Sequence, residues 1–478
     1  MKIKYLALAC AALGSANAFA ANPTYDATAT TPDTVFMIAG ASAQKNALLA
    51  TVPSTVFDTT THGVLYISGP NGSVGWLGDG KSTIFGAGKK VLVIYQSKNG
   101  SAAGLNQLIS TTTTEAEATV LSLPASGCGA TSTPSSPNVA DAQITCSGGS
   151  AAHEADMALA DVHANEFTPG LLVTGAALKN ASVSSTGLEG FGVVVNGVLY
   201  DALLAQNIHD GLLPSSCASA TASTLAVGTG NGACQPSVRK AEYASLVTDG
   251  GQFNSYQALV PDQTGRNITV CRRDDLSGSQ AASNIFFLNN VCGLQGYKGS
   301  LSVTNGANGT VLATDGVYNY TVVDSANNST PYSENCVWSG SATGTTATSD
   351  YALGVVGLAE KDSVDAATPQ SSYPNAKYYF VKIDGVSPNY TAAGAYDATH
   401  RANLISGAYQ FAVEMGAYVK STTTASSVAG KAAKAIADDI SKASLSNIPG
   451  IGYLTGGTFG DGKTSRYSRG GNNCSPLQ

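Results

Sequence analysis

The sequence has few charged residues, and positive ones are the rarer kind. Of 478 residues only 12% are Asp, Glu, Lys or Arg, and 25 Lys and Arg stand against 32 Asp and Glu, which gives a net charge of −7. An acidic chain lacks the basic surface that nucleic-acid binding needs, so nucleic acid is excluded as a partner. An anionic ligand is not excluded, but backbone N–H groups and single arginines must then bind it locally.

Long hydrophobic runs are also missing. A membrane-spanning helix needs about 20 apolar residues in succession, and the apolar stretch Tyr5–Leu13 is too short. It follows Lys2 and Lys4 and precedes the small-residue segment Ala18–Ala20, which is typical of a signal peptide that is removed. We therefore expect residues 1–20 to be a signal peptide and the mature protein to be periplasmic or secreted, without a membrane span.

Metal-binding patterns of cysteine and histidine do not occur. The 9 cysteines and 5 histidines form no CxxC, no HExxH and no Cys/His pair at the spacing of metal ligands. We therefore expect neither a metal nor another cofactor. Cysteines beyond the signal peptide are even in number, and in an oxidising compartment such a set favours disulfides.

The spacing of the cysteines suggests how they pair. Cys128–Cys146 and Cys217–Cys234 each bracket a turn-rich segment and are expected to staple a loop. Between Cys271 and Cys292 an expected helix would place the two residues roughly 20 Å apart at about 1.5 Å per residue, beyond the about 7 Å that a disulfide allows. The remaining pairs are then expected to be Cys292–Cys336 and Cys271–Cys474.

Two Gly-rich segments match the P-loop pattern of nucleotide-binding proteins, Gly75–Ser82 and Gly457–Thr464. A P-loop needs a strand before it and a helix after it, so that the helix N-terminus meets the phosphates. Neither Lys81 nor Lys463 is followed by a helical pattern. Two turn-rich loops are therefore the better interpretation.

An enzymatic alternative comes from three short motifs. Ser42-Ala-Gln-Lys45, Ser325-Ala-Asn327 and Lys463-Thr-Ser465 follow the order of the signatures of penicillin-binding proteins, in which a lysine activates a nucleophilic serine. The third motif lacks its usual Gly, and Ser325 falls in a segment that looks like an insertion. We therefore expect no enzyme, with a serine acyl-transfer enzyme as the alternative.

Short strand-like runs alternate with helical patterns, which is typical of α/β layers built on parallel sheets. Helices are expected at Ser42–Leu49, Ser279–Val291, Leu404–Tyr418 and Ala425–Ala443. Residues 111–150, 214–236 and 293–335 are turn-rich without periodicity and look like insertions. The length exceeds that of one ordinary core, so two domains are expected.

Three segments could supply the donors that a dehydrated oxyanion needs, and each follows a predicted strand. They are Gly40–Ser42, Gly100–Gly104 and Arg272–Ser279. Ser and Gly at a helix start offer N–H and O–H donors where the helix dipole favours negative charge, and an arginine adds a bidentate pair. Each segment alone would also fit a plain helix cap.

The third segment resembles a family signature. Arg273, Asp275, Ser277, Gly278 and Ser279 fall at the spacing of Arg-x-Asp-x-Ser-Gly-Thr in the phosphate-binding components of ABC phosphate importers, with Ser279 in place of Thr. Upstream, the strand Val91–Gln96 followed by Gly100-Ser101 resembles that family's strand–Gly-Ser segment. The segment Asp156–Asp161 resembles its Asp-x-x-x-Ser-Asp segment, although Ala160 replaces the Ser.

The resemblance implies a two-lobed type 2 periplasmic-binding-protein fold of the α/β class, with the ligand in the interlobe cleft. Lobe 1 would comprise residues 21–188 and 385–478, and lobe 2 residues 189–384. Phosphate is the implied ligand and an ABC permease the implied partner. The ligand-binding residues that it implies are Ser42, Ser101, Asp161, Arg273, Asp275, Ser277, Gly278 and Ser279. The family's first loop usually contains Gly-Ala-Thr-Phe, so the role of Ser42 stays open.

The two aspartates among these residues would determine selectivity. An ionised carboxylate can only accept hydrogen bonds, so Asp161 and Asp275 favour a ligand that carries a proton. Hydrogen phosphate has one and sulfate has none, and rejection of a ligand that cannot donate is an effective form of specificity. The long cysteine-stapled insertions leave a second reading open, in which the same fold serves a secreted or surface protein that binds or adheres to another ligand.

Overall fold

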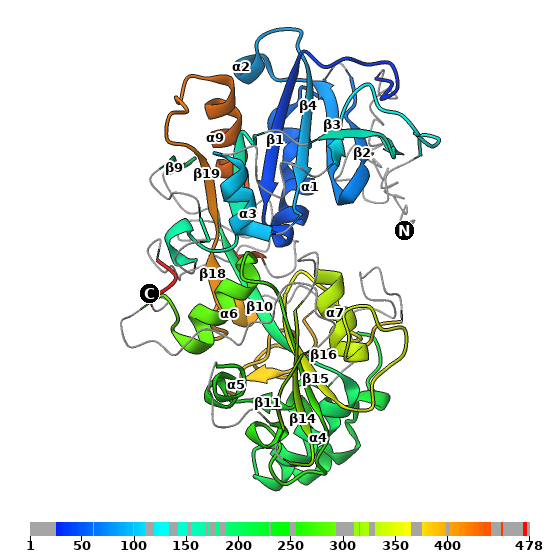
Figure 1. The fold of residues 1–478 in the computed structure, drawn as a ribbon, viewed down its shortest axis with the longest axis vertical. Helices are drawn as coiled ribbons and strands as arrows, with labels where there is room; N and C mark the ends of the chain where they lie inside the picture. The colour runs from blue at the N-terminus through cyan, green and yellow to red at the C-terminus, as the bar shows by residue number, and fades with distance from the viewer. Residues whose placement is uncertain are drawn as a thin grey trace, which may run out of the picture.

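The computed structural model shows two lobes stacked along the long axis of the molecule (Figure 1). It describes residues 25–60, 62–98, 100–109, 119–132, 142–151, 154–167, 171–172, 177–181, 187–228, 231–248, 255–292, 310–314, 316–324, 330–364, 375–397, 402–440, 451–452 and 472–475. The expected signal peptide lies outside these residues. Within them, no helix combines the length and the apolar character that crossing a membrane requires.

Lobe 1 is built on an eight-stranded sheet of order β6-β2-β3-β4-β1-β8-β19-β9. Its strands are β1 (Thr34–Gly40), β2 (Leu65–Ser68), β3 (Val74–Asp79), β4 (Lys90–Gln96), β6 (Ala142–Thr145), β8 (Met157–Ala160), β9 (Leu178–Asn180) and β19 (Gly416–Lys420). Its helices are α1 (Lys45–Val56), α2 (Ser82–Phe85), α3 (Gly100–Gln107) and α9 (Val428–Ile440). Helices α1 and α9 pack on each other and share one apolar core with the sheet. A small sheet of β5 (Thr119–Leu121) and β7 (Gly149–Ala151) packs on β2 and β3, where Leu121 meets Gly69 and Gly75.

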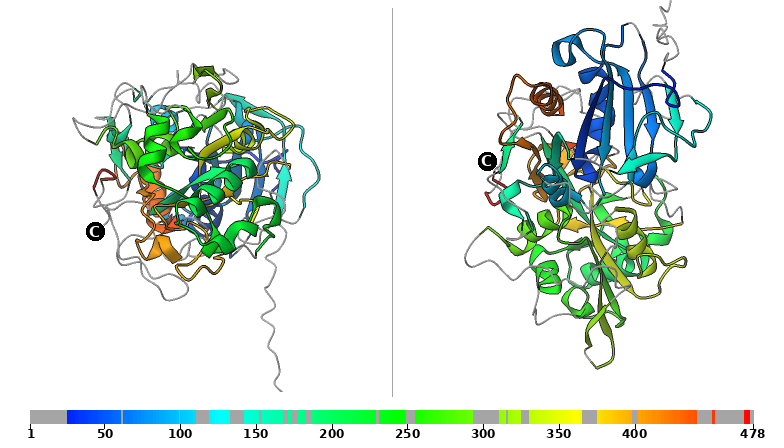
Figure 2. Two further views of the ribbon diagram at one scale, coloured as in Figure 1. Left: turned by 90° about the horizontal axis from the view of Figure 1, so that it is seen from below. Right: turned by 45° about the horizontal axis from the view of Figure 1, so that its top comes forward.

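Lobe 2 is built on a sheet of order β13-β14-β12-β15-β10-β16. Its strands are β10 (Leu188–Val195), β12 (Ile268–Arg272), β13 (Thr310–Thr314), β14 (Asn319–Asp324), β15 (Tyr351–Gly357) and β16 (Tyr379–Phe380), and β11 (Ser237–Val238) pairs separately with β17 (Lys382–Ile383). Its helices are α4 (Gly197–His209), α5 (Lys240–Val247), α6 (Gly278–Leu288), α7 (Thr330–Ser339) and α8 (Ala402–Ile405). Figure 2 shows these helices around the lower sheet from two further sides.

Both sheets follow one strand order. In lobe 1, parallel β4, β1 and β8 are followed by antiparallel β19, and in lobe 2, parallel β14, β12 and β15 are followed by antiparallel β10. Each antiparallel strand comes directly after the chain has crossed between lobes. The chain enters lobe 2 through β10 and returns through β18 (Ala412–Glu414), which pairs with β10, and then β19. The return therefore lies later than residue 385. The prediction of an α/β fold with two lobes is confirmed.

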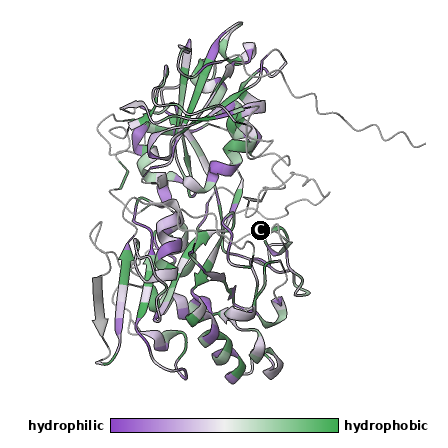
Figure 3. Ribbon diagram, turned by 90° about the vertical axis from the view of Figure 1, so that its right-hand side faces the viewer, coloured by the Kyte–Doolittle hydropathy of each residue, from purple (hydrophilic) through white to green (hydrophobic). Residues whose placement is uncertain are grey.

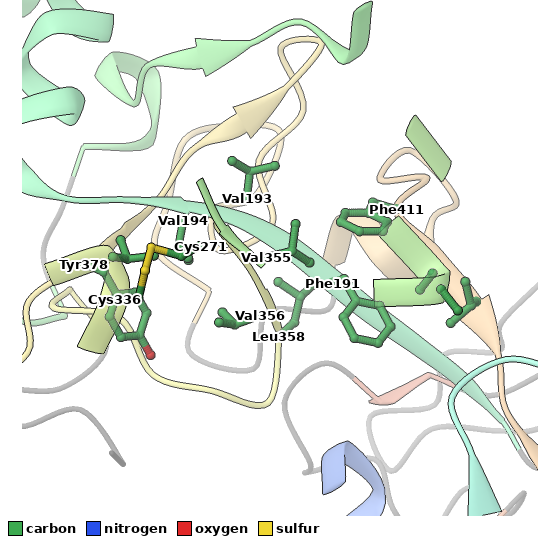
Figure 4. Close-up of a cluster of buried hydrophobic side chains, with 14 of the residues drawn as sticks. Phe191, Val193, Val194, Cys271, Cys336, Val355, Val356, Leu358, Tyr378 and Phe411 are labelled. Carbon is green, nitrogen blue, oxygen red and sulfur yellow. A yellow bond between two sulfur atoms is a disulfide. The ribbon is translucent and has the colours of Figure 1, made fainter. Parts of the chain in front are cut away.

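The two crossings are joined by an apolar core. Parallel strands covered on both faces are continuously apolar, and β10 and β15 are buried along their whole length. Figure 3 shows the apolar strands in the middle of each lobe, with polar residues mostly on the helices. At the crossing, Phe191 of β10 packs against Phe411, which precedes β18, with ring centroids 5.7 Å apart (Figure 4). This contact fixes the position at which the two lobes join.

Four disulfides are present, and two of the pairings expected from the sequence are wrong. Cys128–Cys146 and Cys217–Cys234 form as predicted. In place of Cys292–Cys336 and Cys271–Cys474, however, the bonds are Cys271–Cys336 and Cys292–Cys474. The reason is packing: α7, which carries Cys336, lies against β12, which carries Cys271 (Figure 4). Cys292 follows α6, away from β12, and bonds to Cys474 and not to Cys336.

Two further expectations need correction. The expected helix Leu404–Tyr418 is helical only at α8, because its remaining residues form the crossover strands β18 and β19. Residues 293–335 are not simply an insertion, since β14 lies directly beside β12 in the sheet of lobe 2. The other three expected helices exist, as α1 after a short 3-10 turn at Ser42–Gln44, as α6 and as α9.

The first of the two P-loop matches, Gly75–Ser82, does not have the structure of a P-loop. Gly75 lies within β3, and Lys81 precedes only the four-residue helix α2, where its ammonium group donates to the carbonyl of Ser54. No helix N-terminus long enough to hold a nucleotide phosphate follows. The second match, Gly457–Thr464, and the enzyme motifs that contain Ser325 and Lys463 lie outside the described residues.

Candidate functional site

The carboxyl ends of parallel strands from both sheets meet at the boundary between the lobes. In lobe 1 they belong to β1, β4 and β8, and in lobe 2 to β12, β14 and β15. Ligands of open α/β sheets bind outside such ends, because the loops that follow can present several side chains to one point. The loops after these strands carry most of the predicted site residues: Ser42, Ser101, Asp161, Arg273, Asp275, Ser277, Gly278 and Ser279.

The two helices α3 and α6 bring the lobes into direct contact at their N-termini. The amide of Ala102 donates to the carbonyl oxygen of Leu276 at 2.9 Å. A Cβ atom on Gly278 would lie only 2.4 Å from Oγ of Ser101 and 2.6 Å from a carboxyl oxygen of Asp161. No side chain fits there, so this closed arrangement requires Gly at position 278. Residues predicted from three separate segments are thus brought together.

Asp161, which follows β8, is the central acid of the site. It is 2% exposed, and its Oδ1 has no hydrogen-bond donor among the described residues. Its backbone amide donates to Oγ of Ser101 at 3.3 Å. Burial raises the pKa of Asp161 to about 6, against the opposing influence of Arg273 and of hydrogen bonds with Glu189, Ser101 and Ser279. A buried carboxyl oxygen without a donor is free to accept a proton-bearing ligand group.

Arg273 brings a positive charge from the opposite lobe. It is 4% exposed, its amide donates to Oε1 of Gln280 at 3.2 Å, and its guanidinium donates to the hydroxyl of Thr330 at 3.1 Å. Burial lowers the pKa of Arg273, whereas the nearby carboxyls of Asp274 and Asp161 raise it. An arginine stays protonated in proteins, so the site holds one fixed positive charge at Arg273.

Asp275 is not brought into this cluster. Its partly exposed carboxylate forms an ion pair with the buried guanidinium of Arg272, three residues earlier. The expected pair of aspartates at the ligand is therefore reduced to Asp161 in this arrangement. Asp275 instead supports the loop that places Arg273, because its partner Arg272 ends β12.

The remaining predicted serines lie at element starts around the cluster. Ser277 is the N-cap of α6 and is buried without a capping hydrogen bond from its side chain, and Ser279 is buried one residue into the helix. Ser42 begins the short 3-10 turn after β1 and is only partly buried. Nearby, Gln44 is fully buried, and its Nε2 donates to the carbonyl of Ala160 at 3.0 Å. Its Oε1 has no donor within the part of the chain that the structure describes.

Sequence reasoning missed two ionisable residues of the site, Glu189 and Glu360, and it considered Lys45 only as part of an enzymatic motif. Burial raises the pKa of Glu189, as do the charge and hydrogen bond of Asp161. Burial raises the pKa of Glu360 to about 7, and burial lowers the pKa of Lys45, which faces Glu360. One signal was available for Glu189, since it is the only charged residue in the buried strand Leu188–Val195.

No protein-family model and no curated protein matches the chain. Among solved structures it is similar to a protein described as a phosphate ABC transporter substrate-binding protein, with phosphate bound, from Clostridium perfringens (11% identity, 88% of this chain and 100% of that chain, TM-score 0.40). It is also similar to an ABC-type phosphate transport receptor from Vibrio cholerae (11%, 84% and 93%, 0.36) and to PstS from Borrelia burgdorferi (10%, 88% and 100%, 0.33). The ligand of this chain is therefore inferred from its own site.

Proposed function

We propose that the protein is an exported solute-binding protein that holds a tetrahedral oxyanion, hydrogen phosphate, between its lobes without converting it. The observation that carries the proposal is the meeting of Asp161 and Arg273, from opposite lobes, at the converging N-termini of α3 and α6. An anion needs a positive charge and several N–H and O–H donors, and these elements supply both.

The side chains divide the work of binding. The guanidinium of Arg273 pairs with the ligand's negative charge, and the first amides of α6 donate to its oxygens. The hydroxyls of Ser101 and Ser279, which hydrogen-bond with Asp161 here, turn to the ligand when it binds. The carboxylate of Asp161 accepts a hydrogen bond from the ligand's own hydroxyl group. Sulfate has no such proton, and its oxygens would face a carboxylate across a dry site, so it is rejected.

The two lobes provide a means of capture and release. Because α3 belongs to lobe 1 and α6 to lobe 2, the ligand's donors are complete only when the lobes are closed, as they are at Gly278. In the closed, ligand-bound protein the two lobes have a fixed relative position. An ABC permease would bind this closed form and receive the anion from it. Export to the periplasm or beyond accords with the four disulfides.

A calorimetric titration of protein from which ligand has been stripped tests the proposal. Phosphate and arsenate, which both carry a proton near neutral pH, should bind, and sulfate should not. Methylphosphonate keeps the proton-bearing oxygen but replaces another oxygen with a methyl group, so it should bind more weakly. If sulfate binds as well as phosphate, or if none of the four ligands binds, the proposed function is wrong.

A further inference from the structure

Glu189 occupies an unusual place in the fold. It lies on the crossover strand β10, opposite Val413 of β18, where both passages between the lobes run side by side. It is 1% exposed. A Cβ atom on Gly357 of β15 would lie 3.5 Å from Oε1 of Glu189 and 4.0 Å from Ala43. The carboxyl group is therefore enclosed by elements of both lobes.

The nearest hydrogen-bonding neighbour of Glu189 in the described part of the chain is another acid. Neither of its carboxyl oxygens has a hydrogen-bond donor among the described residues, and its hydrogen-bonding neighbour is the carboxyl group of Asp161. Two buried carboxyl groups in contact cannot both be ionised, because the like charges repel without water to screen them. A proton shared between the two turns that repulsion into a hydrogen bond.

Other charged groups set the balance around this acid pair. Glu360 after β15 acts on Glu189, Arg273 after β12 acts on Asp161 and Glu360, and Lys45 from α1 acts on Glu360. Tyr95 from β4 also lies near the two acids and stays neutral, because burial raises its pKa. Asp274 also lies near Arg273, so in the described residues of the site two cations stand against four acids. An arriving anion adds negative charge, which the two cations can balance only if the acids keep or gain protons.

We propose that Glu189 is a specificity-determining residue that holds a proton toward the bound oxyanion, and that the site takes up a proton when the anion binds. Asp161 accepts a hydrogen bond from the ligand's hydroxyl group, while protonated Glu189 donates one to an unprotonated oxygen. Together the two acids select a ligand that has one oxygen of each kind. The proposal rests on the oxyanion site proposed above and adds to it the second acid and the coupling to protons.

The substitution Glu189→Gln isolates this role. An amide copies the neutral acid in shape and as a donor but cannot titrate. Glu242→Gln is the matched control, because Glu242 pairs with Arg239 on α5 of lobe 2, away from the cleft. For wild type and both variants, the dissociation constant of phosphate is measured from pH 5.5 to 8.5. Titrations in buffers of different ionisation enthalpy give the protons taken up per phosphate. Comparison at equal pH cancels the protonation of phosphate itself.

The wild type and Glu242→Gln should take up more protons per phosphate than Glu189→Gln. Their dissociation constants should rise more steeply with pH, by up to about tenfold more per pH unit for one extra proton. Equal slopes and proton counts in binding-competent Glu189→Gln would overturn the inference and leave the oxyanion site intact. So would loss of binding in a folded Glu189→Gln protein, since a proton-holding role survives that change. If Glu189→Gln does not fold, the wild type alone decides. The inference is then overturned if the wild type takes up no more protons per phosphate than the titration of phosphate itself requires. Absence of phosphate binding by the wild type would instead refute the proposed function.

Discussion

Gly278 of lobe 2 lies against Ser101 of lobe 1 so closely that a Cβ atom at position 278 would be 2.4 Å from the serine Oγ. The contact joins the first residue of α6 to the first turn of α3. In the proposed function the ligand site is complete only while this contact holds, so closure of the lobes and assembly of the donors would be one event.

Gly278→Ala should therefore weaken phosphate binding without unfolding lobe 2. Alanine is compatible with a helix start, but its methyl group would hold the lobes apart. Overpacking of this kind costs about 1–3 kcal/mol, which corresponds to roughly fivefold to a hundredfold in the dissociation constant. Gly197→Ala is the control, because Gly197 also begins a helix and its Cβ would meet Ala222 at 3.3 Å. Unchanged phosphate affinity in Gly278→Ala would show that closure at this contact is not needed.

Arg273→Ala should reduce affinity for every anion that binds. The substitution removes the buried charge that pairs with the ligand, and truncation of a buried charge partner costs about 2–5 kcal/mol. At about 1.4 kcal/mol per decade, the dissociation constant should rise about thirtyfold or more. Phosphate and arsenate titrations measure the loss, and Arg239→Ala, a surface arginine on the same lobe, should bind as the wild type does. An affinity within threefold of wild type would remove Arg273 from the site.

Asp161→Asn should change selectivity more than total affinity. The amide can donate to an unprotonated oxygen, so the penalty on sulfate falls while hydrogen phosphate loses its acceptor. The ratio of sulfate to phosphate dissociation constants should fall at least tenfold in competition titrations at one pH. A uniform loss for both ions would mean that Asp161 serves the structure of the site and not its choice of ligand.

The sequence predicted those parts of the candidate site whose local structure depends on residues nearby in the chain. Ser277, Gly278 and Ser279 sit at a helix start because small and capping residues favour one, and the strand before them ends as the apolar run ends. Glu189 and Lys45 could not be assigned in this way. Their role depends on which strands lie side by side across the crossing, and that is a property of the whole chain. The same holds for Cys271 and Cys336, whose pairing depends on α7 lying against β12.

The crossover segment shows a second limit. The pattern of apolar residues over 404–418 fits either a helix or two short buried strands. Periodicity cannot separate the two when both faces of the segment are covered. The antiparallel pairing of β18 with β10 decides the outcome. Asp275 shows a third limit, because its spacing fits the family signature while its carboxylate is held by Arg272.

The enzymatic alternative leads to a separate prediction at Ser42. Its neighbour Lys45 has a lowered pKa because it is buried, which would suit a general base, but the lysine faces Glu360, which opposes that shift. A nearby carboxyl group favours the protonated lysine and so makes it a poorer base for the serine. Penicillin-like acylating probes should therefore leave the protein unmodified in intact-mass spectrometry. A stable adduct mapped to Ser42 would favour acyl transfer over solute binding.

The buried acids also predict how stability depends on pH. The pKa of Asp161 is raised to about 6 from 3.8, and that of Glu360 to about 7 from 4.5, in each case chiefly by burial. Between the ordinary and the raised values the folded protein binds more protons than the unfolded chain, so its stability falls as pH rises. The free energy of unfolding of ligand-free protein in urea, with disulfides intact, should thus be higher at pH 5 than at pH 8 by about 1 kcal/mol or more. Asp161→Asn cannot titrate, and it should flatten part of this slope. Stability that instead rises from pH 5 to pH 8 would mean that these acids are ionised in the folded protein, and the shared proton would then be absent.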